Sequence, residues 1–124
     1  MCYILVHLGI RVRNATRGKI LGEAIEIAGS SAARRTGLLK HSQLKPGEGL
    51  WIAPCEAIHT FGMKFAIDVA FLDRKKSVRK VRHSLPARRM ALSLLSHSVL
   101  ELPAGTLAET GTEPGDQLVF ERVV

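Results

Sequence analysis

Short apolar runs recur along most of this chain with turn residues between them, and this spacing limits the possible folds more than any other feature of the sequence. In the clearest run, residues 64–73, every second residue from position 65 to position 71 is large and apolar. Alternation with a period of two places these side chains on one face of a β-strand. The segment is therefore predicted to be a strand with one apolar face and an opposite face that carries Asp68.

Six more segments have the apolar and β-branched content of strands and are bounded by turn signals. They are residues 3–13, 20–28, 49–53, 78–83, 98–102 and 117–123. Short helices are predicted at 32–39 and, as a single turn, at 106–110, whereas 87–97 suits either a short helix or a long loop. The pattern predicts a mainly β fold at the margin of α+β, either a small β-sandwich or a partly open barrel of about seven short strands. Long crossover helices are missing, which disfavours a parallel α/β sheet.

The length of the chain and its first residues limit the number of domains and the kinds of targeting segment that we expect. A chain of 124 residues fits one domain, over residues 1–124, with a hydrophobic core of its own. No apolar run approaches the ~20 residues of a membrane-spanning helix. Residues 1–10 are apolar, but Arg11 and Arg13 follow this run and do not precede it, unlike the charges of a signal peptide. With only two cysteines, we expect a reduced, cytoplasmic protein.

The positive charge of the chain is concentrated in one segment. The net charge is +7, yet residues 74–89 contain eight basic residues and no acidic one, and the rest of the chain, with ten basic and eleven acidic residues, carries −1. The candidate basic patch consists of Arg74, Lys75, Lys76, Arg79, Lys80 and Arg82. Such a patch suits docking to an acidic protein or a membrane surface, or simply a solvated edge strand. Nucleic acid is disfavoured as a partner because the segment has no aromatic residue for stacking on bases.

Reactive side chains crowd the segment just before residues 64–73 and the middle of that strand. The candidate pocket residues are Cys55, His59, Thr60, Met63, Asp68 and Glu101. Two small neighbours, Ala66 and Ala70, leave room beside Asp68, as the floor of a pocket requires. The first hypothesis is therefore a ligand- or partner-binding module in which the carboxylates accept hydrogen bonds and the histidine and threonine donate or accept them. No cofactor is predicted.

The same residues allow an enzyme as an alternative. A hydrolase would use Cys55 as its nucleophile and His59 as its base, with a carboxylate to orient the histidine. A metal-assisted enzyme would use Cys55, His59 and Asp68 as three ligands. If Asp68 and Glu101 share one face of neighbouring strands, their pKa values can split for acid–base work. Against this, no helix N-terminus or glycine elbow is predicted to activate Cys55, and structural roles remain open: a buried thiol, a histidine bonded to backbone, and carboxylates that fix strand register.

Several short blocks of the sequence occur in an order and spacing that resemble a known family. The blocks are 35–39 (RTGLL), 49–51 (GLW), 58–63 (IHTFGM), 67–73 (IDVAFLD), 100–105 (LELPAG) and 115–116 (GD). Together they resemble domain-of-unknown-function family 192 over about residues 11–121. The resemblance implies a compact, mainly β domain of bacteria or archaea, with no assigned reaction, substrate or cofactor. Many members have Trp-Met where this chain has Phe61-Gly62-Met63, a departure that leaves Met63 in place.

Overall fold

The computed structural model describes residues 9–28 and 43–122, so the helix predicted at 32–39 and residues 3–8 of the first predicted strand lie outside the described residues. The described part contains nine strands and one short helix. The elements are β1 (Ile10–Asn14), β2 (Lys19–Ala28), β3 (Glu48–Ile52), β4 (Ala57–His59), β5 (Ile67–Leu72), β6 (Val78–Leu85), β7 (Met90–Leu92), β8 (Ser98–Pro103), α2 (Thr106–Thr110) and β9 (Leu118–Arg122).

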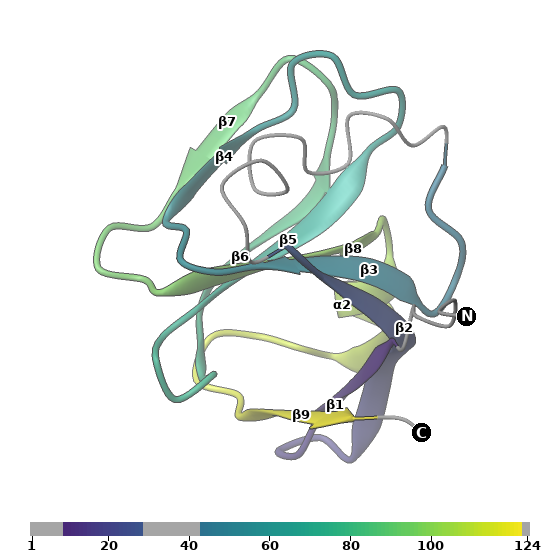
Figure 1. The fold of residues 1–124 in the computed structure, drawn as a ribbon, viewed down its shortest axis with the longest axis vertical. Helices are drawn as coiled ribbons and strands as arrows, with labels where there is room; N and C mark the ends of the chain where they lie inside the picture. The colour runs from purple at the N-terminus through teal and green to yellow at the C-terminus, as the bar shows by residue number, and fades with distance from the viewer. Residues whose placement is uncertain (1–8, 29–42, 123–124) are drawn as a thin grey trace, which may run out of the picture.

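Seven of the strands form one sheet, which curls into a half-barrel (Figure 1). Its strand order is β6-β5-β8-β3-β2-β1-β9, and β2 and β3 are the one parallel pair among the described strands. A bridge between Ser77 and Gln117 joins the two edges of the sheet at one end, and the amide of Val78 donates to the carbonyl of Asp116 across the same gap (2.8 Å). The predicted mainly β class is confirmed; of the two predicted architectures the large sheet forms the partly open barrel, and the described chain has nine strands where about seven were predicted.

The remaining strands, β4 and β7, form a two-stranded ribbon that packs on the outer face of the half-barrel. The protein has two clusters of buried apolar side chains, one on each face of the large sheet, and the ribbon covers the cluster on the outer face. The inner core fills the half-barrel and includes Ile25, Ala70, Leu72, Leu100, Leu102, Leu107 and Leu118. The outer core includes Leu50, Ile67, Val69, Phe71 and Val99 of the sheet and Ile58 and Ala91 of the ribbon. Because both cores meet at β5, all six residues of this strand are buried.

Of the two alternatives predicted for residues 87–97, the short helix is wrong, and the long loop is interrupted by a strand of three residues. The segment contains strand β7, which pairs with β4 through Ile58 and Ala91. Met90 and Leu92 are exposed whereas Ala91 is buried, so the segment has the period of a strand. With only three residues each, β4 and β7 are too short for alternation to reveal them in the sequence. The helical turn at 106–110 is confirmed as α2, and it is flanked by Gly105 and Gly111 in the left-handed conformation.

Candidate functional site

Asp68 is fully buried, and its carboxylate accepts hydrogen bonds from three backbone amides. Its Oδ1 accepts a hydrogen bond from the amide of Ser84 (2.8 Å), and its Oδ2 accepts from the amides of Gly105 (3.1 Å) and Leu107 (2.9 Å). Ser84 belongs to an irregularity in β6, where the register against β5 shifts and its own φ is 46°. Asp68 therefore ties β5 to β6 and to the start of α2, and it does not form the floor of an open pocket.

Glu101 is buried in a different way. Its side chain lies in β8 between Leu50 of β3 and Val69 of β5, both members of the outer core. Within the described part of the chain, its Oε1 has no hydrogen-bond partner. Burial disfavours the charged form and raises the pKa of Glu101 to about 7. Ionisation of this carboxyl group therefore destabilises the folded protein.

The register of the sheet separates these two carboxyl groups. β5 and β8 are neighbours, as a shared acid–base site requires, but Asp68 lies opposite Leu102 and Glu101 lies opposite Val69. Residues that pair directly point to the same face of a sheet. Asp68 thus faces the inner core and Glu101 the outer core, so the predicted pair of carboxylates on one face is not formed.

Thr60 and Met63 have structural positions. Thr60 is fully buried; its Oγ1 donates to the carbonyl of Pro86 (2.6 Å) and accepts from the amide of Arg89 (2.9 Å). Met63 is buried in the outer core. The hydrogen bonds of Thr60 fasten the turn after β4 to the loop between β6 and β7.

Cys55, His59 and Asp68 do not come together as the predicted triad or metal site. The thiol of Cys55 is half-buried and donates to the carbonyl of Ala57 (3.1 Å). His59 is exposed on β4, with its ring 5.6 Å from that of Phe61. Asp68 is in the inner core, on the far side of the sheet from the ribbon. The described residues contain no group of three His, Cys, Asp or Glu side chains placed to hold a metal ion.

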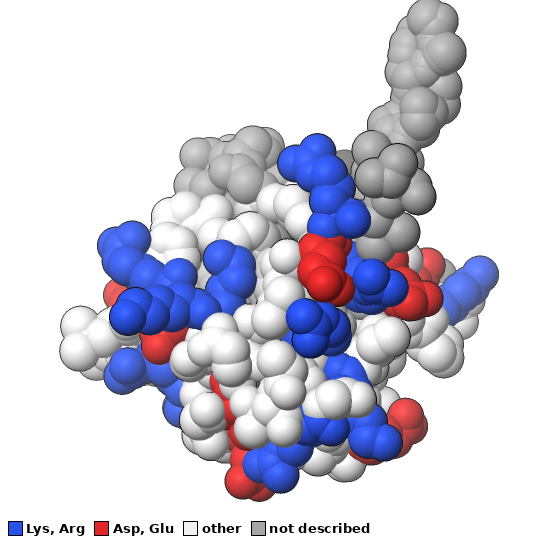
Figure 2. All heavy atoms as spheres, turned by 90° about the horizontal axis from the view of Figure 1, so that it is seen from below, with Lys and Arg blue, Asp and Glu red and all other residues white. Residues whose placement is uncertain are grey.

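The predicted basic patch divides into exposed and engaged residues. Arg74, Lys75 and Arg79 are exposed and Arg82 is half-buried. Lys76 instead places its ammonium 5.2 Å from the ring centre of Trp51, and Lys80 donates from Nζ to the carbonyl of Leu92 in β7 (2.7 Å). Figure 2 shows a face on which basic side chains predominate over acidic ones. Because β6 is an edge strand of the large sheet, its charges also discourage pairing with other chains.

The outward side of the β4–β7 ribbon is an apolar surface that the sequence did not reveal. Register pairs His59 with Met90 and Ala57 with Leu92 on this side, and the chain continues into Leu94 and Leu95. We call the set His59, Phe61, Met90, Leu92, Leu94 and Leu95 the ribbon face. Five of the seven large apolar residues that are exposed in the described chain belong to it, and Leu95 is 85 % exposed. In the sequence, residues 90–92 are only a short apolar run, and such a run is equally compatible with a helix.

A hollow of about 550 Å³ lies beside the ribbon face. Three separate segments line it: the link between β3 and β4, the β5–β6 hairpin, and the loop before β8. The lining residues are Pro54, Cys55, Glu56, Arg74, Leu95, Ser96 and His97. We call this space the Cys55 hollow. Cys55 is the one predicted pocket residue that lines it, and Arg74 is the one residue of the predicted basic patch that does.

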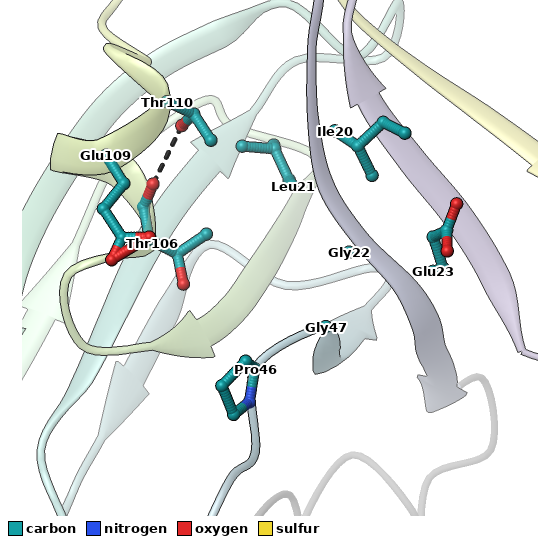
Figure 3. A pocket seen from close by; sticks show the side chains of 9 residues that line it. All are labelled: Ile20, Leu21, Gly22, Glu23, Pro46, Gly47, Thr106, Glu109 and Thr110. Atoms are coloured by element: carbon teal, nitrogen blue, oxygen red, sulfur yellow. Dashed lines mark hydrogen bonds between the residues drawn. The ribbon is translucent and has the colours of Figure 1, made fainter.

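A second hollow, of about 400 Å³, lies between β2 and α2. In Figure 3, Leu21 points from β2 toward the helix, while Thr106 and Glu109 lie on the helix side. Gly22 permits this arrangement, because a Cβ atom there would come within 2.7 Å of the carbonyl oxygen of Gly47. None of the predicted pocket residues lines this space.

Among the described residues, there is no helix that is both long and apolar enough to cross a membrane.

Known proteins resemble this chain in sequence and in structure. A UPF0127 protein of Thermococcus sibiricus is 29% identical over 116 residues, which cover 87% of this chain and 73% of the relative. A solved structure from Sinorhizobium meliloti, described as "a putative transcription regulator", has a TM-score of 0.78 at 24% identity and covers 90% of this chain and 91% of its own. A protein of unknown function from Novosphingobium aromaticivorans has a TM-score of 0.78 at 20% identity, with 96% and 91% covered. At these identities, the two structures share the fold.

The family match extends over nearly the whole described chain. Residues 12–120 match DUF192, whose description is "Uncharacterized ACR". This range contains the ribbon, both hollows and the half-barrel except for the first residues of β1 and the last residues of β9. The chain therefore belongs to domain-of-unknown-function family 192.

Proposed function

We propose that this protein is a binding module that docks an acidic partner segment with apolar side chains onto the ribbon face. The observation that carries the proposal is the concentration of exposed large apolar side chains on the ribbon and the residues that directly follow its strands: Phe61, Met90, Leu92, Leu94 and Leu95. Outside this place, the exposed large apolar residues of the described chain are Ile20 and Ile27, both on β2. Large apolar patches on a soluble domain are typical of interaction sites.

The basic side chains around the ribbon face indicate that the partner is acidic. Arg88 and Arg89 are exposed directly before β7, and Lys80 reaches the backbone of β7 from the neighbouring strand β6. Arg74 lies beside Leu95 in the lining of the Cys55 hollow. An apolar surface bordered by cations complements a segment in which carboxylates alternate with apolar side chains. Charges of this kind increase the association rate and select against basic partners.

Binding of short synthetic peptides, followed by fluorescence anisotropy, tests the proposal. The first peptide alternates Glu with Leu, the second alternates Glu with Ser at the same charge, and the third alternates Lys with Leu. We expect the first to bind most tightly and its affinity to fall with added salt. The double variant Met90→Ser, Leu92→Ser removes two exposed side chains without disturbing a core, and it should lose about tenfold or more in affinity.

The matched control is Ile20→Ser, which removes an apolar side chain that is 50% exposed on β2, away from the ribbon. It should bind the Glu-Leu peptide as the wild type does. Equal binding of the Glu-Leu and Glu-Ser peptides, or an unchanged affinity in the double variant, would contradict the proposal. If the protein bound duplex DNA or anionic lipid vesicles more tightly than the Glu-Leu peptide, the partner would be the nucleic acid or the membrane surface, and the proposal of an acidic segment would be wrong.

A further inference from the structure

We propose that the Cys55 hollow is a binding site for a small zwitterion with an apolar side chain, of the class of the free aliphatic amino acids. The proposal does not rest on docking at the ribbon face, because it depends on the polar lining of the hollow. Volumes of a few hundred Å³ are typical of small-molecule sites, and about 550 Å³ leaves ample room for one amino acid.

The walls of the hollow are fixed to one another. The amide of Cys55 donates to the carbonyl of His97 (2.8 Å), and the amide of His97 donates to the carbonyl of Leu72 in β5 (2.8 Å). The amide of Leu95 donates to Oε2 of Glu56 (3.1 Å), and Ser93 donates from its amide to the carbonyl of Glu56 (2.9 Å). Three chain segments are therefore held together before any ligand arrives, which reduces the entropic cost of binding.

Two opposite charges line the hollow without neutralising each other. Arg74 forms no ion pair with Glu56 or with any other acidic group of the described chain. Glu56 uses Oε2 for the amide of Leu95, which leaves the charge of the group available to a cation. A guanidinium binds a carboxylate through parallel hydrogen bonds, and a carboxylate binds an ammonium. One ligand that carries both groups satisfies both residues, whereas a simple organic acid would meet the repulsion of Glu56.

The rest of the lining suits an aliphatic side chain. Leu95 is 85% exposed and Pro54 is exposed, so both offer apolar surface that a ligand would cover. Burial of that surface adds a hydrophobic contribution to binding. The arrangement therefore points to an amino acid such as leucine, with its carboxylate at Arg74 and its ammonium at Glu56.

Three compounds of nearly the same shape test this assignment by calorimetric titration. Leucine carries both charges, 4-methylpentanoate lacks the ammonium, and isoamylamine lacks the carboxylate. We expect leucine to bind tightest. Arg74→Gln should lower the affinity for leucine by about tenfold or more. Glu56→Gln should do the same while its amide oxygen still accepts from Leu95, so the loop stays in place.

Lys75→Gln is the matched control, since it removes an exposed cation next to Arg74 that does not line the hollow. It should leave leucine binding unchanged, as should the double variant Met90→Ser, Leu92→Ser that tests the ribbon face. Equal affinity for the three compounds, insensitivity to Arg74→Gln and Glu56→Gln, or no binding of leucine at millimolar concentration would each overturn the assignment. Because the ribbon variants and the hollow variants differ, failure of one proposal leaves the other standing.

Discussion

Asp68 and Glu101 are buried carboxyl groups on adjacent strands, but the structure treats them in opposite ways. Asp68 faces the inner core and accepts hydrogen bonds from three backbone amides. Glu101 faces the outer core, with one oxygen lacking a partner in the described part of the chain and a pKa raised to about 7 by burial. The surrounding backbone decides the difference: α2 and the irregularity in β6 bring amides to Asp68, whereas Glu101 lies between strands whose amides already pair.

The comparison shows that burial alone does not identify a functional acid. A carboxylate that satisfies several amides is a structural connection, and its removal leaves those amides without partners. A carboxylate that lacks partners weakens the fold, and its presence in a core is the feature that calls for a functional explanation. In this protein Glu101, and not Asp68, is the carboxyl group of that kind.

The largest predicted effect is that of Asp68→Ala. The substitution leaves three amides without their acceptor in or near the inner core, and we expect a loss of about 4 kcal/mol in the free energy of unfolding. Asp68→Asn should lose less, because its amide oxygen can still accept. Urea denaturation of the purified variants measures the effect.

The exposed acid Glu109 provides the control, since Glu109→Gln removes a carboxylate with no comparable contacts and should be nearly neutral. A stability of Asp68→Ala equal to that of the wild type would show that the amides find other partners. The expected instability also means that Asp68→Ala is a poor probe of ligand binding, because loss of binding would follow from loss of the fold.

The second prediction concerns the pH dependence that Glu101 imposes. In the folded protein its pKa is about 7, against an ordinary value of 4.5, so the folded state retains the proton over this range while the unfolded state releases it. Stability therefore falls as pH rises from about 4.5 to 7, by an amount on the order of 3 kcal/mol. Glu101→Gln removes this dependence. The free energy of unfolding of the variant should therefore increase relative to that of the wild type as pH rises.

The difference between the two proteins at each pH isolates Glu101 from the other titrating groups. Urea denaturation across this range is the measurement. A difference that stays constant with pH would show that Glu101 is already paired when ionised, and it would remove the contrast with Asp68.

Much of the fold was predictable because the strands of the large sheet are long enough to show their period. β2, β5 and β6 combine alternation or β-branched content with clear turns, and the turn signals mark where the chain reverses. β4 and β7 were not predictable, since three residues cannot establish a period and Met90, Leu94 and Leu95 also fit a helix. Pairing between strands far apart in the chain, such as β5 with β8, is a tertiary property that local patterns do not encode.

The candidate site was less predictable than the fold, because it depends on register. Whether Asp68 and Glu101 share a face is decided by which residues pair, and a shift by one residue reverses the answer. Residue type alone also could not distinguish a carboxylate that binds amides from one that awaits a ligand. Cys55 lines a hollow, but the residues around it, His97 above all, come from a loop whose position the sequence does not fix.

The smallest predicted effect adds a third buried carboxylate to the comparison. Asp116 is 3% exposed, and its Oδ2 accepts from Nε of Arg17 (2.9 Å), from the side-chain amide of Asn14 (2.9 Å) and from the backbone amide of Glu113 (3.1 Å). Arg17, the main cause, lowers the pKa of Asp116 to about 2. Unlike Asp68, this group depends partly on a cation at the surface.

Arg17→Gln should therefore raise the pKa of Asp116 and lower stability slightly, since Asn14 and the amide of Glu113 remain. Because the folded pKa lies below the ordinary 3.8, the stabilisation is present above that pH and is lost as pH falls toward 2. The difference between variant and wild type should shrink over the same interval, and NMR titration of the Asp116 carboxyl carbon with urea denaturation at each pH would measure both quantities. Lys75→Gln, which removes an exposed cation that forms no ion pair with an acidic group of the described chain, is the control and should show no such dependence. If the cost of Arg17→Gln were the same at all pH values, Arg17 would act through packing, and Asp116 would join Asp68 as a carboxylate held by neutral donors.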